Sequence, residues 1–348
     1  MTLVIVLVTA GLAAATWTPQ TSGVTARLRG VSAISDRVAW ASGASGTILR
    51  TADGGRTWQR LSIPGSEKLD FRDVDAATDR LAWALSIGPG ESSRIYRTAD
   101  AGAHWDEQFV NHDPKAFFDA MAFWDARRGI AVSDSVDGRF VIVKTADGGR
   151  TWTPIPADSL PPALTNEGAF AGSGTNVAVL APNHVWIGTG AATRSRVLRS
   201  RDGGNTWAVA DTPVASSASA GIFSMAFRDP LHGIVVGGDY RKESEAGNNA
   251  AITADGGATW APVTGLGGFR SVVAYVPRSH SAIAVGPSGT DVSVDDGKTW
   301  TVVQGDGFHA FAIAPSGTRA WGVGEAGRIG LLTISGLASA AWRRQTVH

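Results

Sequence analysis

The chain has 348 residues, of which 43% are hydrophobic, with 43 glycines and 13 tryptophans, a composition that favours short strands and tight turns over helices. Its 31 basic residues balance its 31 acidic residues, which excludes a global charge that attracts nucleic acid or an anionic membrane. The absence of cysteine excludes disulfides, thiolate metal sites and cysteine nucleophiles.

The N-terminal segment is apolar. Residues Leu3 to Ala15 form an unbroken run of apolar and small side chains that ends in three alanines, as at a signal-peptide cleavage site. As a helix, these 13 residues would span about 20 Å, less than the roughly 30 Å core of a bilayer. The segment predicts export to the periplasm with 1–15 as a signal peptide or a signal anchor, the latter holding the protein at the membrane. Residues 16–348 are expected to form one domain.

The first repeating unit begins after this segment, and its strands can be assigned from the alternation of apolar residues. Residues 28–34 are expected to form an inner strand, 37–43 an apolar second strand, 47–51 a third strand and 57–61 a fourth. The second-strand pattern recurs as RLAWALS, RGIAVSD, HVWIGTG, HGIVVGG, SAIAVGP and RAWGVGE, which makes seven units.

An octapeptide closes six of these units. It reads TADGGRTW, TADAGAHW, TADGGRTW, SRDGGNTW, TADGGATW and SVDDGKTW, and its final tryptophans are 47, 47, 55, 53 and 40 residues apart. This period is typical of one four-stranded blade. The sequence therefore predicts an all-β fold, a seven-bladed β-propeller of four-stranded antiparallel blades.

Each octapeptide has the composition of a hairpin turn. The aspartate can accept backbone N–H bonds, and the glycines can adopt positive φ. The pattern resembles the Asp-box of the sialidase-like propeller superfamily. We therefore expect a structural role for the six box aspartates, which are Asp53, Asp100, Asp147, Asp202, Asp255 and Asp295. Trp40, Trp83, Trp186 and Trp321 lie on second strands and are expected in the core.

The last unit, 308–348, has lost the octapeptide and keeps only Trp342. Residues 17–20 resemble the strand that follows an Asp-box, so we expect this segment to help close the ring against the last blade. The sequence leaves open which terminus supplies the outermost strand.

Catalytic and metal-binding signatures are weak. The seven histidines show no metal-ligand spacing, and every glycine cluster falls in a hairpin or at a strand end, so no metal and no cofactor are predicted. A sialidase would need an arginine triad, a tyrosine with a glutamate partner and an acidic aspartate. The expected Arg-Ile-Pro motif is absent, and Tyr240 is the only tyrosine with nearby carboxylates. A non-enzymatic protein is favoured, with a glycoside hydrolase or glycan-binding protein as the alternative.

Long, charged insertions fall in the second-to-third-strand loops and in the loops that join one blade to the next, which open on the same face of a propeller. The inner strands begin next to these loops, and the residue at the start of an inner strand is often basic. We expect them to surround the mouth of the central channel as partner anchors; the alternative is that they only solvate strand ends or pair with neighbouring acids. The candidate partner-binding residues are Arg29, Arg72, Arg270, His309, Asp134, Asp137, Arg139, Asp239, Tyr240 and Arg241.

With seven units, Asp-boxes, an export signal and the segments LRGVS, VAWASG and GTILRTADGGRTW, the chain resembles the photosystem II stability and assembly factor family over nearly its whole length. The resemblance implies a non-enzymatic propeller that helps to assemble a membrane photosynthetic complex on its periplasmic or lumenal side. It also implies an arginine-rich patch, which Arg29, Arg72 and Arg270 match. The expected partner is a membrane protein complex, with no nucleic acid and no small-molecule cofactor. Because a fold is shared more widely than a partner, the resemblance implies the propeller fold more directly than a photosynthetic partner.

Overall fold

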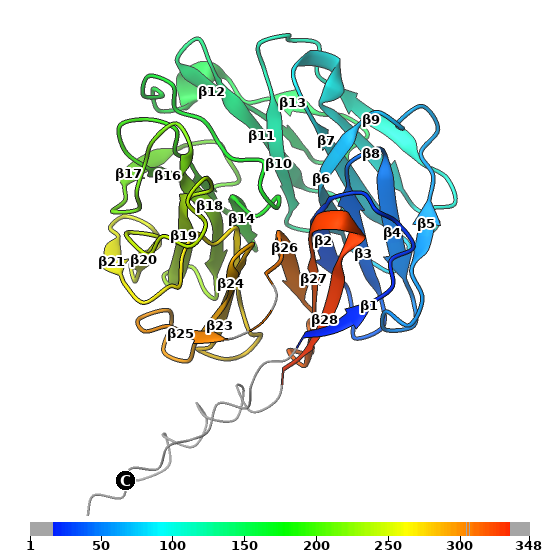
Figure 1. Ribbon diagram of the computed structural model, residues 1–348. Helices are drawn as coiled ribbons and strands as arrows, with labels where there is room; N and C mark the ends of the chain where they lie inside the picture. Colours follow the sequence, from blue (N-terminus) through cyan, green and yellow to red (C-terminus); the bar gives the residue numbers. More distant parts are fainter. Residues whose placement is uncertain (1–16, 304, 306, 335–348) are drawn as a thin grey trace, which may run out of the picture.

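The computed structural model describes residues 17–303, 305 and 307–334, so the predicted export segment and Trp342 lie outside the described part. Seven four-stranded antiparallel sheets form a ring, and Figure 1 looks along its axis with the inner strands around the centre. The described residues contain 3-10 turns at η1 (Gly90–Ser92), η2 (Ala157–Ser159) and η3 (Glu325–Gly327), but no α-helix. Accordingly, no helix there could cross a membrane. The predicted fold is confirmed.

The blades follow the chain, each running from its inner strand outward. The first three are β2 (Leu28–Ala33), β3 (Ala39–Gly43), β4 (Thr47–Thr51) and β5 (Gln59–Leu61); β6 (Asp70–Ala76), β7 (Ala82–Ile87), β8 (Arg94–Thr98) and β9 (Asp106–Val110); and β10 (Phe118–Phe123), β11 (Gly129–Val136), β12 (Arg139–Thr145) and β13 (Thr153–Pro154). The next three are β14 (Val177–Leu180), β15 (His184–Gly188), β16 (Arg196–Ser200) and β17 (Ala208–Asp211); β18 (Ala220–Phe227), β19 (Gly233–Asp239), β20 (Ala250–Thr253) and β21 (Ala261–Val263); and β22 (Val272–Tyr275), β23 (Ala282–Gly286), β24 (Gly289–Ser293) and β25 (Thr301–Val303).

The seventh blade joins the two ends of the described chain. It contains β26 (Ala310–Ile313), β27 (Arg319–Val323) and β28 (Ile329–Thr333), and its outermost strand is β1 (Trp17–Gln20). β1 pairs antiparallel with β28 in a register that sets Trp17 opposite Leu332. The prediction that residues 17–20 help to close the ring is confirmed, and the N-terminal side supplies the outermost strand.

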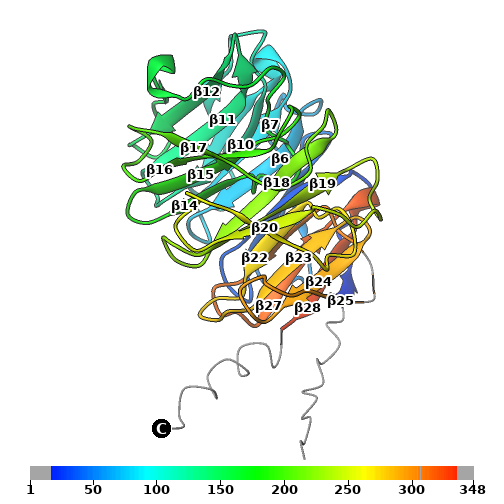
Figure 2. The ribbon, with the colours of Figure 1, turned by 90° about the vertical axis from the view of Figure 1, so that its left-hand side faces the viewer.

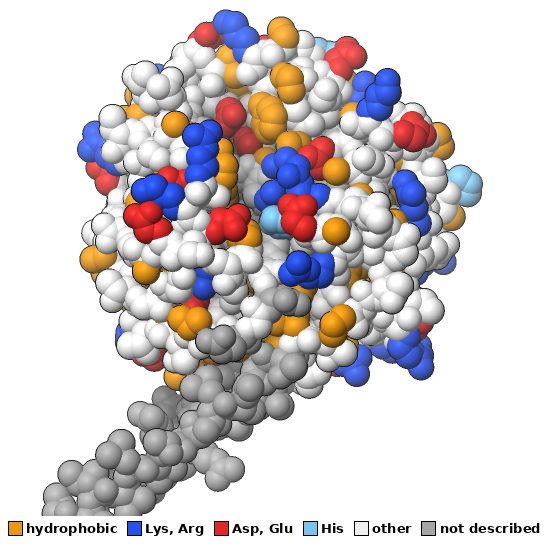
Figure 3. Space-filling model, in the orientation of Figure 1, with side chains coloured by type: hydrophobic (Ala, Val, Ile, Leu, Met, Phe, Trp, Pro, Cys, Tyr) orange, Lys and Arg blue, Asp and Glu red, His pale blue; other side chains and the backbone are white. Residues whose placement is uncertain are grey.

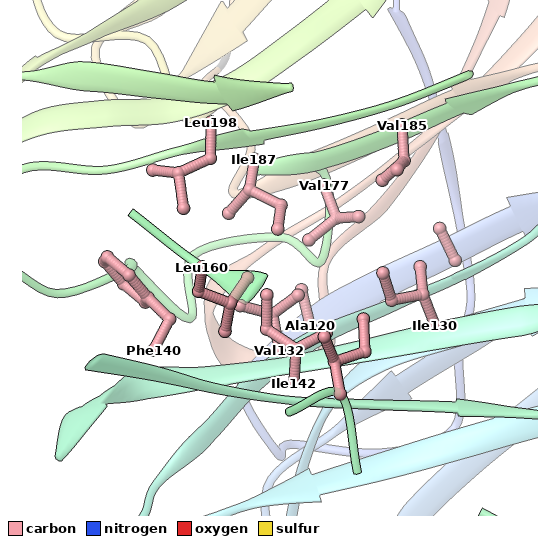
Figure 4. Close-up of a cluster of buried hydrophobic side chains, with 12 residues drawn as sticks. Ala120, Ile130, Val132, Phe140, Ile142, Leu160, Val177, Val185, Ile187 and Leu198 are labelled. Atoms are coloured by element: carbon pink, nitrogen blue, oxygen red, sulfur yellow. The ribbon is translucent and has the colours of Figure 1, made fainter. Parts of the chain in front are cut away.

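The core consists of apolar layers between neighbouring blades. In the described residues, seven clusters of buried side chains each join one blade to the next. Figure 4 shows the layer between blades 3 and 4, where Ile142 and Val132 of one sheet face Ile187 and Leu198 of the other. Figure 2 shows from the side how successive sheets stack around the ring. As predicted, the second-strand tryptophans are buried; they are Trp40, Trp83, Trp186 and Trp321.

The octapeptides form the predicted turns between third and fourth strands. In the first, the backbone N–H and the hydroxyl of Thr57 donate to the two carboxylate oxygens of Asp53, with N···O and O···O distances of 3.0 and 2.7 Å. Thr51 Oγ1 donates to Asp53 and accepts the N–H of Gly55. These hydrogen bonds, led by those from Thr57, lower the pKa of Asp53 to about 2. All six box aspartates accept equivalent bonds within their own turn, which explains them without catalysis.

Two of the turns place a residue other than glycine in the left-handed region, namely Ala101 in the second blade and Asp296, with φ of 63°, in the sixth. Ala101 has φ of 66°, whereas the matching residue in the fourth blade is Gly203, with φ of 73°. A Cβ costs about 1 to 2 kcal/mol in this left-handed region. A Cβ added at Gly203 would meet only Asn183 Oδ1, at 4.0 Å, so the space is open there and strain alone is tested.

We therefore expect Ala101→Gly to raise the free energy of unfolding by about 1 kcal/mol and Gly203→Ala to lower it by a similar amount. Denaturant unfolding of both variants measures the effect. Equal stabilities for the parent and both variants would contradict the strain argument.

Candidate binding site

The loop face of the ring opens into a central pocket of about 710 Å³. This volume lies in the range of roughly 300 to 1,000 Å³ that is usual for ligand pockets. Figure 3 shows this face, on which basic, acidic and hydrophobic side chains gather around a central hollow. The pocket is lined by inner-strand residues and by residues of the loops 166–172 and 240–243.

β-Bulges place four of the lining side chains. The inner strands of blades 1, 2, 3 and 5 each shift register by one residue, between Leu28 and Gly30 in the first and at the matching place in the others. A bulge leaves one residue unpaired and redirects its side chain. The four bulge residues all line the pocket; they are Arg29, Arg72, Asp119 and Phe223.

One wall of the pocket is cationic. Arg27, Arg29 and Arg72 lie together on this wall, where Asp70 accepts from Arg72 Nε at 3.0 Å and lies 3.9 Å from Arg27, while the charges of Glu325 and then Asp70 act on Arg29. Arg72 also donates to the carbonyl of Ala171, at 3.0 Å. Burial, and then the repulsion of Arg72 and Arg27, lower the pKa of Arg29 to about 10, so it stays protonated at neutral pH. Its buried Nε has no hydrogen-bond partner in the described part of the chain.

His309 lies beside this wall as expected, but it does not add to the charge. Its Nε2 is 2.8 Å from Glu325 Oε1, and the side chain is buried. Burial, and then the positive charge of Arg29, lower the pKa of His309 to about 4. The imidazole is therefore neutral at pH 7 and adds no positive charge to the wall, although His309 lines the pocket as expected.

Arg270 is the clearest error among the predicted anchors. Its side chain is 1% exposed, and its Nε donates to the buried Asp291 at 2.6 Å. The cause is a register difference. The backbone N–H groups of Leu28, Arg270 and Phe308 donate to the carbonyls of Gly324, Gly237 and Gly286, which are equivalent glycines at or near the ends of the previous blades' second strands. Arg270 therefore occupies a buried position, one residue before the position of Arg29.

Two further carboxyl groups hold the loop 166–172 against the pocket. The backbone N–H of Ala169 donates to Asp134 Oδ1 at 2.8 Å, and burial raises the pKa of Asp134 to about 6. Glu167, missed in the sequence, is 1% exposed and forms a bidentate pair with the buried Arg196. A carboxylate–guanidinium pair of this kind fixes both partners in one geometry. The loop is therefore a positioned wall of the pocket.

The remaining predicted contacts are divided between the pocket and its surroundings. Tyr240 lines the pocket and is 41% exposed. Arg241 stacks over the Tyr240 ring at 5.7 Å, outside the lining. Asp137, at the tip of the β11–β12 hairpin, pairs with Lys115, and Arg139 donates to the carbonyl of Gly138. Asp239 faces a separate, smaller depression. The last four residues are not brought together with the arginine wall.

Several lining residues carried no sequence signal. Asp119 follows Phe118, and only the bulge reveals that Asp119 rather than Phe118 faces the pocket. Phe170 lies in an insertion without periodicity, and Phe269 precedes Arg270, whose position in the strand was misassigned from the sequence. Arg27 directly precedes a predicted inner strand, where a rule that included the preceding loop would have found it.

The channel below the pocket contains buried acids that have a structural role. An inner strand has no strand on its axial side, so its free N–H groups need other acceptors. Asp73 accepts the N–H of Met121 at 2.7 Å, and Asp75 accepts that of Phe123 at 2.9 Å. Burial raises the pKa of Asp73 to about 8 and that of Asp75 to about 6. The hydroxyl of Ser224, which does not titrate, likewise accepts the N–H of Val273.

Comparisons with known proteins support the fold only. No protein-family model matches the chain, and no curated protein matches it. Among solved structures, "YCF48 bound to D1 peptide" and "YCF48 from Cyanidioschyzon merolae" are each 18% identical with a TM-score of 0.65, over 92% of this chain and 97% and 99% of theirs. "Structure of U3-55K" is 10% identical with a TM-score of 0.64, over 91% of this chain and 98% of its own. The chain shares its architecture with these proteins.

The raised pKa of Asp73 predicts a pH-dependent stability. Between pH 4 and pH 8 the carboxyl is ionised in the unfolded chain but protonated in the fold, so its contribution to stability falls as the pH rises. We expect Asp73→Asn, which keeps an acceptor for Met121, to be more stable than the parent at pH 8, on the order of 2 kcal/mol, and about equally stable at pH 4.

Denaturant unfolding at both pH values measures this difference. Asp137→Asn, at an exposed hairpin tip, is the matched control and should not change the pH slope. A parent and an Asp73→Asn variant with parallel pH profiles would show that Asp73 does not titrate in this range.

Proposed function

We propose that this chain is an exported, non-enzymatic propeller that binds a segment of a protein partner in the loop-face pocket. The observation that carries the proposal is the cationic wall, where Asp70 pairs with both Arg27 and Arg72 and the buried Arg29 Nε has no hydrogen-bond partner among the described residues. A charge left unpaired in a partly buried site favours a ligand that brings the opposite charge. Arginine is also enriched at interface hot spots.

The kind of partner is proposed on two grounds. One solved structure of similar fold is of YCF48 with a bound D1 peptide, so this architecture can hold a peptide. The resemblance to photosystem II assembly factors adds a membrane complex as partner, with a photosynthetic reaction-centre complex as its most specific form. The apolar segment 3–15 supports a periplasmic location, with 16–348 as the exported domain.

Removal of two arginines of the cationic wall should weaken partner binding. We expect Arg29→Ala combined with Arg72→Ala to weaken binding about thirtyfold or more, as for hot-spot arginines. Arg270 is excluded from this variant, because its loss would leave Asp291 charged and buried. The measurement is quantitative recovery of cross-linked partners from native membranes, followed by mass spectrometry, after a thermal melt has shown that the variant is folded.

The control is Arg56→Ala combined with Arg150→Ala, which removes the same charge from two exposed Asp-box turns on the opposite face. The control should recover partners as the parent does. Equal recovery by both double variants would reject the loop-face pocket as the binding site.

One observation favours a second candidate, a sialidase-like glycosidase. The pocket brings three arginines together with Tyr240, Glu243 and the acid Asp134, which is part of the set that such an enzyme needs. However, no hydrogen bond joins Tyr240 to Glu243 in the described residues, and Tyr240 packs against Arg241 and Phe223 instead. A nucleophilic tyrosine needs an adjacent base.

The purified protein is therefore expected to release no fluorophore from 4-methylumbelliferyl sialoside or from common aryl glycosides between pH 4 and pH 8. Turnover that disappears in Tyr240→Phe, with the fold intact, would establish the glycosidase instead.

A further inference from the structure

The wall of the pocket opposite the arginines is aromatic. Phe223, the bulge residue of β18, stacks on Phe170 with ring centroids 4.1 Å apart and an interplanar angle of 17°. Phe269 packs edge-on against Phe223 at 4.7 Å, and Tyr240 lies at 6.1 Å. The four rings come from four separate segments, namely the loop 166–172, β18, the β19–β20 loop and the segment before β22.

These rings lie outside the seven clusters that join one blade to the next. The chain has 12 phenylalanines. Eight of them occur in the seven inter-blade clusters, whereas the other four line the pocket, and these are Phe117, Phe170, Phe223 and Phe269. Phe170 is partly exposed and Tyr240 is 41% exposed, whereas Phe223 and Phe269, at 5% and 4% exposed, are buried beside them. Aromatic surface left outside the core in a pocket is typical of a binding site.

The backbone beneath Phe170 is shaped to accommodate its ring. A Cβ at Gly190 or Gly221 would lie 2.8 or 2.6 Å from Phe170 Cε2, so the ring lies directly on these two glycines. The loop that carries Phe170 is held by the Ala169 contact to Asp134 and by the Glu167–Arg196 pair. The ring is therefore positioned before any ligand binds, which lowers the entropy cost of binding.

The two walls impose a joint requirement on the occupant. Arg27, Arg29 and Arg72 favour a negative charge on one side of a pocket whose other side can bury an apolar ring or branched chain. Both surfaces line a single pocket, so the two groups must be adjacent in the ligand. A purely acidic segment would leave Phe170 and Tyr240 exposed, and a purely apolar segment would cover Arg29 while its buried Nε still has no partner among the described residues.

We propose that the pocket recognises a short peptide segment in which a carboxylate is adjacent to an aromatic or branched aliphatic residue, with Phe170 and Phe223 as the subsite for that apolar side chain. This inference rests on the proposed function and adds the chemistry of the bound segment. Within it, Phe170 is a specificity-determining residue.

The test begins with a displayed library of random seven-residue peptides, selected on the immobilised full chain. We expect enrichment of Asp or Glu next to Phe, Tyr, Trp, Leu or Ile. The most enriched peptide is then synthesised with a fluorescent label, together with a version in which the apolar residue is replaced by alanine, and affinities are measured by fluorescence anisotropy.

Phe170→Ala should weaken binding of the enriched peptide about tenfold, while binding of the alanine peptide should be equally weak for the parent and the variant. Phe170→Leu keeps an apolar side chain without the stacked ring, and its affinity for the enriched peptide should lie between those of the parent and Phe170→Ala. The control is Leu231→Ala, which removes a 50% exposed apolar side chain on the opposite, Asp-box side and should change nothing. Thermal melts of each variant establish that it is folded.

The outcomes separate this inference from the proposed function. If Arg29→Ala weakens the peptide but Phe170→Ala does not, the pocket binds peptides and the aromatic subsite is wrong. If neither substitution matters, or no peptide is enriched, both proposals fail. If 3-phenylpropionate, a free aryl carboxylate, binds as tightly as the whole peptide, the pocket is a small-molecule site and the peptide assignment is overturned.

Discussion

Each four-stranded sheet has apolar side chains on both faces, and each face can be buried only against another sheet. In the described chain the sheets are arranged in a closed ring, and one hydrophobic layer lies between every pair of neighbouring blades. A gap in the circle would expose two such faces at once. The pairing of β1 with β28 completes the last sheet, and Trp17 packs on Phe308 at 4.5 Å there.

Closure of the ring also determines the chemistry along its axis. Seven inner strands converge without pairing to one another, so their axial N–H groups must bond to side chains of the neighbouring blade. Asp73, Asp75 and Ser224 provide such acceptors. Because these sites are buried, the carboxylic acids among them resist ionisation. The same convergence places the bulge residues together at the loop face, although they are far apart in the sequence.

The pocket that results has positioned side chains, with arginines on one part of its lining and aromatic rings on another. Its arginines and two of its rings are carried by inner strands or their starts, and the loop that adds Phe170 is held by Asp134 and by the Glu167–Arg196 pair. A preorganised site of this kind discriminates by matching charge and apolar surface at the same time.

The sequence alone determined what depends on local, repeated chemistry. The octapeptide with its aspartate, glycines and tryptophan predicts a hairpin turn wherever it occurs, and the second-strand pattern around Trp40 and Trp83 predicts buried strands, so together they determined the blade type and the number seven. The face on which the pocket opens followed from the insertions.

Only the tertiary structure decided which residues face the axis. Arg72 and Arg270 stand in nearly identical tetrapeptides, FRDV and FRSV. Yet a β-bulge turns Arg72 toward the pocket, while a one-residue difference in register buries Arg270 beside Asp291. Side-chain direction alternates along a strand, so a shift of one residue turns a side chain from one face of the sheet to the other. The shift depends on contacts with the preceding blade, which no local sequence pattern encodes.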